Sequence, residues 1–313
     1  MDIQYLIFLQ ELRESLGNFS VIFFEFISFI PKSPLSILIP GILFWCVNKR
    51  AGLFLMFVAS FGQVINQLIK NTFCVYRPWI FNSELQPVED ALKKASSYSF
   101  PSGHTSMATA IYGGLAFFYR KKFPLLIIPC VLIILLVALS RNFLGVHTPQ
   151  DVLVAMAVTF LVIILGEKIF DQLEFDRNFS TIAFFAGIIF LIAATLYFML
   201  KSYPVDYANG KIIVETAKAQ LDSVDKVGSF AGFLLGAFLE NIFINFKTNV
   251  SQRKKFRRAI IGCVVGGVAM ALLLLIKMTH FEIFYEFCKG FLPFFSVIFL
   301  APLVFNHYER KNR

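Results

Sequence analysis

The sequence is poor in acidic residues, histidine and cysteine. Among 313 residues only 20 are Asp or Glu, against 29 Lys or Arg, and only four are His. Without a cluster of carboxylates, the chain offers no obvious site for a divalent metal, and we expect neither a metal nor a cofactor. The cysteines have no metal-ligand spacing and no disulfide framework, so we interpret them as small apolar residues. They are Cys46, Cys74, Cys130, Cys263 and Cys288.

Period-2 alternation is also lacking, which excludes a barrel. Apolar residues are abundant: they make up 57% of the chain, and 39 of them are Phe. Since a span needs about 20 apolar residues, we predict an all-α polytopic membrane bundle of about nine to ten spans. The apolar stretches are 51–69, 104–118, 123–140, 152–166, 178–200, 227–246, 259–276 and 290–305, with the shorter 17–31 and 34–48 flanking the break "PKSP".

The net charge of +9 is confined to particular loops. Basic clusters at 49–50, 119–122, 252–258 and 309–313 fall in alternate loops. This positive-inside pattern places them in the cytoplasm and argues against nucleic acid as the partner. The remaining loops, 70–100, 141–150 and 201–226, then face outward.

Location and organisation follow from the same features. The first 19 residues are amphipathic and lack the regions of a cleavable signal peptide, so an interfacial helix or a cytosolic lead-in fits better. Short loops and the Phe- and Ile-rich composition indicate a bacterial plasma membrane, although an endoplasmic reticulum membrane would satisfy the same charge rule. We expect a catalytic core at 1–170 and additional helices at 178–313.

Two features of the second half carry further expectations. The outward loop 201–226 is mixed in charge, and we expect order only at its ends. The stretch "GSFAGFLLGAF" (228–238) predicts close helix approach. Glu25, Glu240 and Asn241 lie in apolar stretches, where they either line a second pathway or make helix-packing hydrogen bonds.

The first of three polar clusters pairs Lys70 with Arg77-Pro78. Lys70 ends the 51–69 stretch on its outward side. A cation at a helix C-terminus is favourable by about 0.3–1 kcal/mol, and snorkelling lysines are ordinary. Taken alone, this cluster is therefore explained by helix stability and by snorkelling at the membrane surface, without a function.

The second cluster is "PSGH", residues 101–104. Pro101 can start a helix, Ser102 can cap it, and Gly103 removes a side chain where a ligand can approach the backbone. Helix N-termini bind anions through unpaired amides. Capping does not explain His104, because an unpaired imidazole is unfavourable in the first turn of a buried helix.

The third cluster is "SRNFLGVHTPQD", residues 140–151. Thr148 and Pro149 read as an N-cap and first helical position, which makes Asp151 part of a near capping box. Alternatively, Asp151 accepts a hydrogen bond from one ring nitrogen of His147. That bond fixes the tautomer and leaves the other nitrogen free to attack.

Together the clusters bring three cations, two histidines and one carboxylate to one membrane face. Arg141, which follows the 123–140 stretch, is the third cation. Several cations indicate an anion with several charged oxygens, and guanidinium groups suit phosphate. Phosphate chemistry without a metal requires protein cations and a protein nucleophile.

These blocks resemble the signature of the type-2 phosphatidic acid phosphatase superfamily of integral membrane lipid phosphatases. That signature is K-x6-RP, then PSGH, then SR-x5-H-x3-D. It stands here as Lys70 with Arg77-Pro78, Pro101-Ser102-Gly103-His104, and Ser140-Arg141 with His147 and Asp151. The resemblance covers about residues 50–170. Residues 178–313 lie outside it, and similar extensions occur in sphingosine-phosphate and glucose-6-phosphate phosphatases.

The resemblance implies a role for each site residue. His147 would be the nucleophile that forms a phosphohistidine, and Asp151 would orient it. His104 would protonate the leaving oxygen and then activate water. The phosphate-binding residues implied are Lys70, Arg77, Ser102, Gly103 and Arg141.

We therefore expect hydrolysis of a phosphomonoester or diphosphate on a membrane lipid at the extracytoplasmic face. Undecaprenyl diphosphate, phosphatidylglycerol phosphate and phosphatidic acid are all compatible substrates. The loop 79–99, starting with Trp79, Ile80 and Phe81, would rest on the interface and guide the headgroup. Alternatives are a phosphotransferase with the same residues and a non-catalytic lipid-binding or transport relative. The oligomeric state is open.

Overall fold

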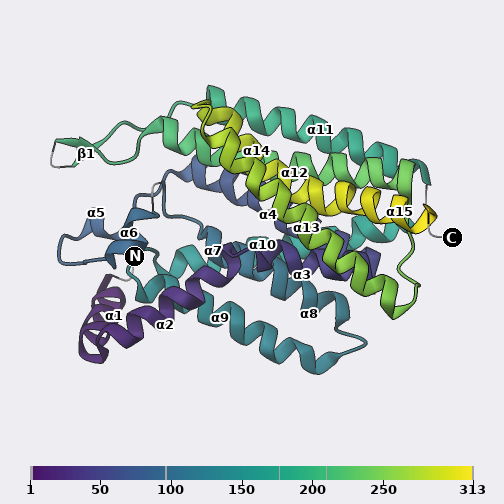
Figure 1. Ribbon diagram of the computed structural model, residues 1–313. Coiled ribbons are helices and arrows are strands. Elements are labelled where there is room, and N and C mark those ends of the chain that lie inside the picture. Colours follow the sequence, from purple (N-terminus) through teal and green to yellow (C-terminus); the bar gives the residue numbers. More distant parts are fainter. Residues whose placement is uncertain (1–2, 96, 176, 209, 312–313) are drawn as a thin grey trace. The chain divides into compact units, whose positions relative to one another are not determined.

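The structure is a computed structural model that describes residues 3–95, 97–175, 177–208 and 210–311 (Figure 1). It contains two compact units that interleave along the chain. Unit 1 comprises residues 1–33, 65–163 and 198–222, and unit 2 comprises 34–64, 164–197 and 223–313. Four long helices run from one unit into the other. The division expected at 170–178 stays a prediction.

Unit 1 consists of many short helices joined by polar segments. Its own elements are α1 (Ile3–Leu16), α2 (Asn18–Phe29), η1 (Ile30–Lys32), α5 (Pro78–Phe81), α6 (Glu89–Lys93), α7 (Gly103–Ala108), η3 (Thr109–Gly113), α8 (Gly114–Tyr119), η4 (Pro124–Leu126), α9 (Ile127–Phe143), β1 (Tyr207–Ala208) and β2 (Lys211–Ile212). The helices shared with unit 2 are α4 (Lys49–Phe73), α10 (Pro149–Phe175), α11 (Arg177–Leu200) and α12 (Thr216–Leu239).

Unit 2 is built mainly from long helices. Its own elements are α3 (Leu35–Ile42), η2 (Leu43–Val47), η5 (Glu240–Ile244), α13 (Gln252–Lys277), α14 (Glu282–Phe295), η6 (Ser296–Leu300) and α15 (Ala301–Lys311). Glycines allow two of its helices to touch. A Cβ on Gly228 or Gly232 of α12 would lie 2.3 or 2.4 Å from the carbonyl oxygens of Phe287 and Phe291 on α14. The close helix approach expected at 228–238 is therefore confirmed.

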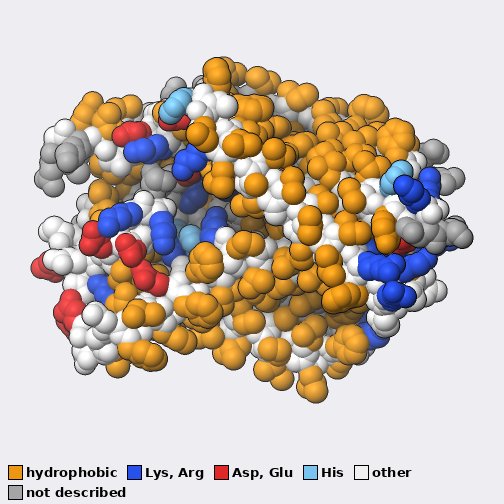
Figure 2. Space-filling view, in the orientation of Figure 1, with side chains coloured by type: hydrophobic (Ala, Val, Ile, Leu, Met, Phe, Trp, Pro, Cys, Tyr) orange, Lys and Arg blue, Asp and Glu red, His pale blue; other side chains and the backbone are white. Residues whose placement is uncertain are grey.

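Among the residues described, seven helical segments are long and apolar enough to cross a membrane, or eight if the bent pair Asn18–Lys32 and Leu35–Val47 forms one span. Figure 2 shows hydrophobic side chains along the visible faces of the long helices and charged side chains near their ends. The stretch expected at 104–118 forms the consecutive helices α7, η3 and α8, which are shorter than the other spans. The polytopic all-α membrane fold is confirmed.

The loop between α11 and α12 differs from expectation. Instead of being ordered only at its ends, it contains the β1–β2 pair, and α12 already begins at Thr216. The expectation was wrong because Tyr203 and Val214 are buried in one cluster with Tyr98. These apolar anchors hold a segment whose average composition is polar.

The segment between α4 and α7 is likewise packed within unit 1. Trp79 contacts the cluster of Ala91, Leu144 and Val146, so it is turned inward, whereas Phe81 remains 52% exposed. Arg13 of α1 donates to the Gln86 carbonyl at 2.5 Å. This bond holds α1 against the loop, and the choice between an interfacial helix and a cytosolic lead-in stays a prediction.

Candidate active site

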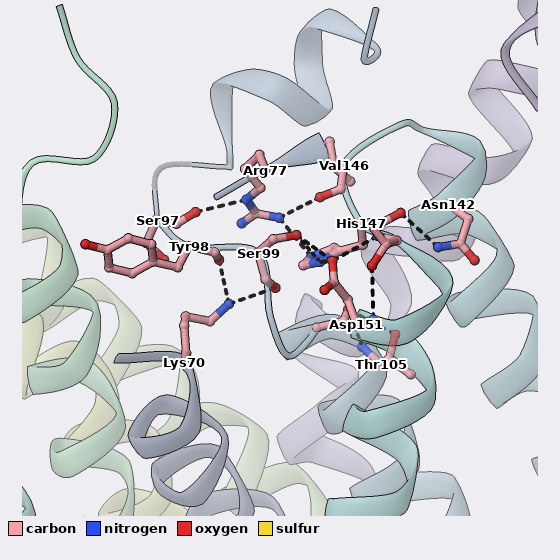
Figure 3. A network of polar contacts seen from close by, with 12 residues as sticks. Lys70, Arg77, Ser97, Tyr98, Ser99, Thr105, Asn142, Val146, His147 and Asp151 are labelled. Carbon is pink, nitrogen blue, oxygen red and sulfur yellow. Dashed lines mark hydrogen bonds and ion pairs between the residues drawn. The ribbon is translucent and has the colours of Figure 1, made fainter. Parts of the chain in front are cut away.

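All eight candidate residues lie in unit 1, at or near the ends of helices. Figure 3 labels four of them, Lys70, Arg77, His147 and Asp151. Lys70 is in the last turn of α4, and Arg141 is in the last turn of α9. Arg77 directly precedes α5, and His147 lies between α9 and α10. The remaining candidates are Ser102, Gly103 and His104 at the start of α7 and Asp151 in the first turn of α10.

The carboxylate of Asp151 both caps α10 and contacts His147, which are the two alternatives that the sequence left open. Its Oδ2 accepts from the Thr148 backbone at 2.9 Å, and its own amide lies 3.3 Å from Thr148 Oγ1, which completes a capping box. The same oxygen lies 3.1 Å from His147 Nδ1 and accepts from Ser99 Oγ at 2.5 Å. The helix cap therefore fixes the carboxylate that orients the imidazole.

The backbone at His147 is held by a tight turn. Gly145 has a φ of +75°, and a Cβ there would lie 3.1 Å from Pro87 Cα, so glycine is required for both conformation and space. The His147 carbonyl accepts from Asn142 Nδ2 at 2.9 Å. The Leu144 carbonyl accepts from the Val88 amide at 3.1 Å, which joins this turn to the outer loop.

Arg77 occupies the other side of the imidazole. It donates to the carbonyls of Ser97 (2.9 Å) and Val146 (2.8 Å), and its Nη1 lies 3.0 Å from His147 Nε2. Since Nδ1 faces a carboxylate, Nδ1 carries the proton and Nε2 accepts from Arg77. Burial lowers the pKa of His147 well below its usual range, and the Arg77 charge acts in the same direction. Both effects favour the neutral form of the imidazole.

Lys70 and Arg141 are buried without a carboxylate partner among the residues described. Lys70 Nζ donates to the carbonyls of Tyr98 (2.7 Å) and Ser99 (3.2 Å). Arg141 donates from Nη1 to Ser28 Oγ, while its buried Nε has no hydrogen-bond partner in the part of the chain that is described. Buried polar donors are normally satisfied, so the unpartnered Nε of Arg141 is a donor that an anion could use.

The "PSGH" segment forms a capped helix start. Ser102 is the N-cap, and its Oγ accepts from the Thr105 amide (3.4 Å) and hydroxyl (3.0 Å). The Ser102 amide donates to the Asp151 carbonyl at 2.9 Å, which ties this start to α10. The helix begins at Gly103, so Pro101 precedes the cap and is not the first helical residue.

His104 is half-buried in the first turn of α7. It lies near enough to Arg141 and to Lys32 of η1 for their charges to act on it. The charge of Lys32 also acts on Lys70. A fourth cation, outside the sequence motif, therefore contributes to the positive potential of the site.

Sequence reasoning missed several of these contacts. Ser99 binds the same carboxylate oxygen as His147, and the only signal for it was the polar run directly before "PSGH". Ser28 and Lys32 come from the N-terminal bent pair, far from any motif. Within the described residues, no group of three or more His, Cys, Asp or Glu side chains is placed to hold a metal ion.

Models of known protein families match most of the chain. A family model described as "PAP2 superfamily" matches residues 51–175. A second, described as "PAP2 superfamily phosphatase, transmembrane extension", matches residues 224–313. The two matches lie one after the other along the chain and leave residues 1–50 and 176–223 unmatched.

Three curated relatives are similar to parts of the chain. Phosphatidylglycerophosphatase B of Bacillus subtilis (strain 168) is 32% identical over 146 residues, which is 44% of this chain and 67% of the relative. Undecaprenyl-diphosphatase BcrC of the same organism is 34% identical over 114 residues, 36% of this chain and 54% of the relative. Sphingosine-1-phosphate phosphatase 2 of Homo sapiens is 25% identical over 202 residues, 63% of this chain and 45% of the relative. No solved structure matches the chain.

Proposed function

The chain belongs to the PAP2 superfamily and is a lipid phosphatase of that family; on this premise we propose that it hydrolyses a phosphomonoester or diphosphate on a membrane lipid, without a metal, through a phosphohistidine on His147. The observation that carries the proposal is the state of this imidazole. Nδ1 is held by Asp151 at 3.1 Å, and Nε2 lies 3.0 Å from Arg77 Nη1.

Binding begins with charge. Lys70, Arg77 and Arg141 have no carboxylate partner among the residues described, and a phosphate group would supply the negative charge. The unpartnered Nε of Arg141 would donate a hydrogen bond to it. Guanidinium donors suit the spacing of phosphate oxygens. When phosphate draws Arg77 away from His147, the Nε2 lone pair becomes available.

The first chemical step forms a P–N bond between His147 Nε2 and phosphorus while the bond to the lipid oxygen breaks. His104 donates a proton to that leaving oxygen. The imidazole becomes cationic, and Asp151 stabilises the positive charge through Nδ1–H. The cations hold the non-bridging oxygens as charge shifts onto them.

The second step reverses these roles. Neutral His104 accepts a proton from water, and the resulting hydroxide oxygen attacks phosphorus while the P–N bond breaks. Inorganic phosphate leaves, and His147 returns to its neutral form. The sum of both steps is hydrolysis of one phosphate ester or anhydride bond.

The substrate and location follow from the same premise. The names of the bacterial relatives support phosphatidylglycerol phosphate and undecaprenyl diphosphate as candidates, with phosphatidic acid as a third. The basic loop clusters support an orientation with the site on the extracytoplasmic side, and the two bacterial relatives support a bacterial plasma membrane. Membrane lipids and the phosphorylated lipid substrate are then the chain's partners.

The test measures phosphate release by detergent-purified protein in the presence of EDTA. The panel holds the three lipids above, sphingosine phosphate and glucose 6-phosphate, with His147→Ala as the control. Release that survives EDTA and vanishes in the variant supports the proposal and ranks the substrates. Release that EDTA abolishes overturns the metal-free mechanism. No release by folded protein, followed by transfer once an acceptor lipid is added, identifies a phosphotransferase instead.

A further inference from the structure

Unit 2 has a second group of cations, far along the chain from the active-site residues. Figure 2 shows Lys and Arg side chains gathered where α13 begins and α15 ends. A cavity lies there, between the two helices. Its lining residues are Lys254, Arg257, Arg258, Ile261, Phe305, Tyr308 and Glu309.

One of the three lining cations is neutralised within the protein. Arg258 is buried and forms a two-pronged ion pair with Glu309, with N–O distances of 2.7 and 2.9 Å. It also donates to the Lys247 carbonyl at 2.8 Å and lies over the Phe305 ring. Arg258 therefore builds the floor of the cavity and is not left for a ligand.

The other two lining cations have no such partner. Lys254 and Arg257 are half-buried, and neither forms an ion pair with the residues described. Arg257 only approaches the ring of Tyr308, at 5.9 Å. With Glu309 already matched by Arg258, the cavity carries two uncompensated positive charges beside an aromatic ring.

The placement of these charges is unfavourable for the helix itself. The first turn of α13 has no acidic residue, and the N-cap Ser251 makes no side-chain capping bond. Cations near a helix N-terminus oppose the macrodipole, whereas an anion there is stabilised. An anionic ligand would relieve both the dipole and the charge repulsion.

The surroundings of the cavity are apolar. Phe256 and Ile260, beside the cations on α13, are 70% and 48% exposed, and Val264 further along is 60% exposed. These side chains belong to a membrane-spanning helix, so acyl chains would cover them. The ligand that fits is therefore anionic at one end and apolar at the other.

We propose that the cavity between α13 and α15 binds the headgroup of an anionic phospholipid, with Lys254 and Arg257 on its phosphate and its acyl chains along Phe256 and Ile260. The charge rule places these helix ends at the cytoplasmic leaflet, where anionic lipids attract basic residues near the membrane surface. The site is separate from the proposed chemistry, and it gives the C-terminal helices a lipid-binding role.

The test compares lipid binding by full-length protein in dodecyl maltoside, read by native mass spectrometry. The background is His147→Ala, so turnover does not interfere. The parent should bind phosphatidylglycerol at least about tenfold more tightly than phosphatidylcholine. The double variant Lys254→Gln/Arg257→Gln should lose most of this preference. The matched control, Lys121→Gln/Lys122→Gln, alters the exposed basic turn of unit 1 and should keep it.

Three results would overturn the proposal. They are an unchanged preference in the double variant, an equal loss in the control, and displacement of the lipid by millimolar inorganic phosphate, which would indicate a free-anion site. The double variant removes only repelling charges, so its thermal midpoint should not fall. In the chain with His147 restored, its phosphate release from a short-chain substrate should match the parent, which separates this site from catalysis.

Discussion

The two units neutralise their buried charges in different ways. In unit 2 the buried ions have partners: Glu240 pairs with Lys49 at 2.7 Å, and Arg258 pairs with Glu309. In unit 1 the buried cations of the candidate site, Lys70, Arg77 and Arg141, contact carbonyls, a hydroxyl and an imidazole. Within the described residues, none of these three has a carboxylate partner.

The difference separates structural charges from functional ones. A buried charge without a counterion costs free energy, which an anionic ligand at the candidate site would offset. In unit 2 the buried ion pairs join helices to one another. Glu240, which pairs with Lys49, is therefore a residue of helix packing. Unit 1 leaves three cations in need of an anion. Four sets of variants test this contrast, in order of expected effect.

The largest effect should come from His147→Ala. Removing the proposed nucleophile should lower phosphate release by at least about 10³-fold, because no other group can form the covalent intermediate. Rapid-quench labelling with radioactive substrate measures the phosphoenzyme directly. His307→Ala, an exposed histidine of α15 in unit 2, is the matched control and should label normally. Normal labelling of His147→Ala would remove it as the nucleophile.

Asp151→Asn should come next, with a loss of about 10²–10⁴-fold in kcat. The amide oxygen can still cap α10, but a neutral group cannot stabilise the imidazolium. Ser99→Ala, which removes a donor to the same oxygen, should cost only about tenfold. Steady-state kinetics and thermal unfolding check both variants. Equal losses from the two would show that Asp151 acts through packing and not through its charge.

Arg141→Lys and Arg258→Lys should have opposite consequences. Arg141→Lys keeps the charge but loses the guanidinium geometry, so kcat/KM should fall about 10²-fold while the thermal midpoint stays the same. Arg258→Lys breaks the two-pronged pair with Glu309, which should lower the unfolding free energy by about 1–3 kcal/mol with little change in kcat. The contrast between the units is wrong if these two outcomes are exchanged.

The smallest effect belongs to a backbone contact in unit 2. Gly232→Ala would force a Cβ against the Phe291 carbonyl and should destabilise the protein by about 1–3 kcal/mol, with catalysis by folded protein intact. Gly266→Ala on α13 is the matched control, because nothing lies within 4 Å of its added Cβ. It should be neutral or stabilise slightly. Reduced kcat in Gly232→Ala would show that this contact shapes the active site.

Residue patterns with local physical meaning were predicted well. The Thr148–Asp151 cap and the proximity of His147 to Asp151 follow from spacing on one helix turn, and both are present. The close approach of another helix to α12 follows from the absence of a side chain at its glycines. Each of these features depends on residues close together in the sequence, or on the absence of a side chain.

Features that depend on tertiary structure were not predicted. The carbonyls that hold Lys70 and Arg77 belong to Ser97, Tyr98, Ser99 and Val146, and a backbone acceptor leaves no trace in the sequence. The order of the segment before α12 depends on burial of Tyr203 against Tyr98, which average polarity conceals. The roles of the catalytic residues themselves stay predictions.

The hydrogen bond between Arg77 and His147 Nε2 has a consequence for the protein at rest. While it lasts, the lone pair that would attack phosphorus is occupied, so the imidazole is protected from alkylating reagents and stray electrophiles. Only an anion strong enough to compete for the guanidinium releases it. Under the proposed mechanism, the phosphate ligand itself frees the nucleophile that attacks it, and the site without ligand stays unreactive.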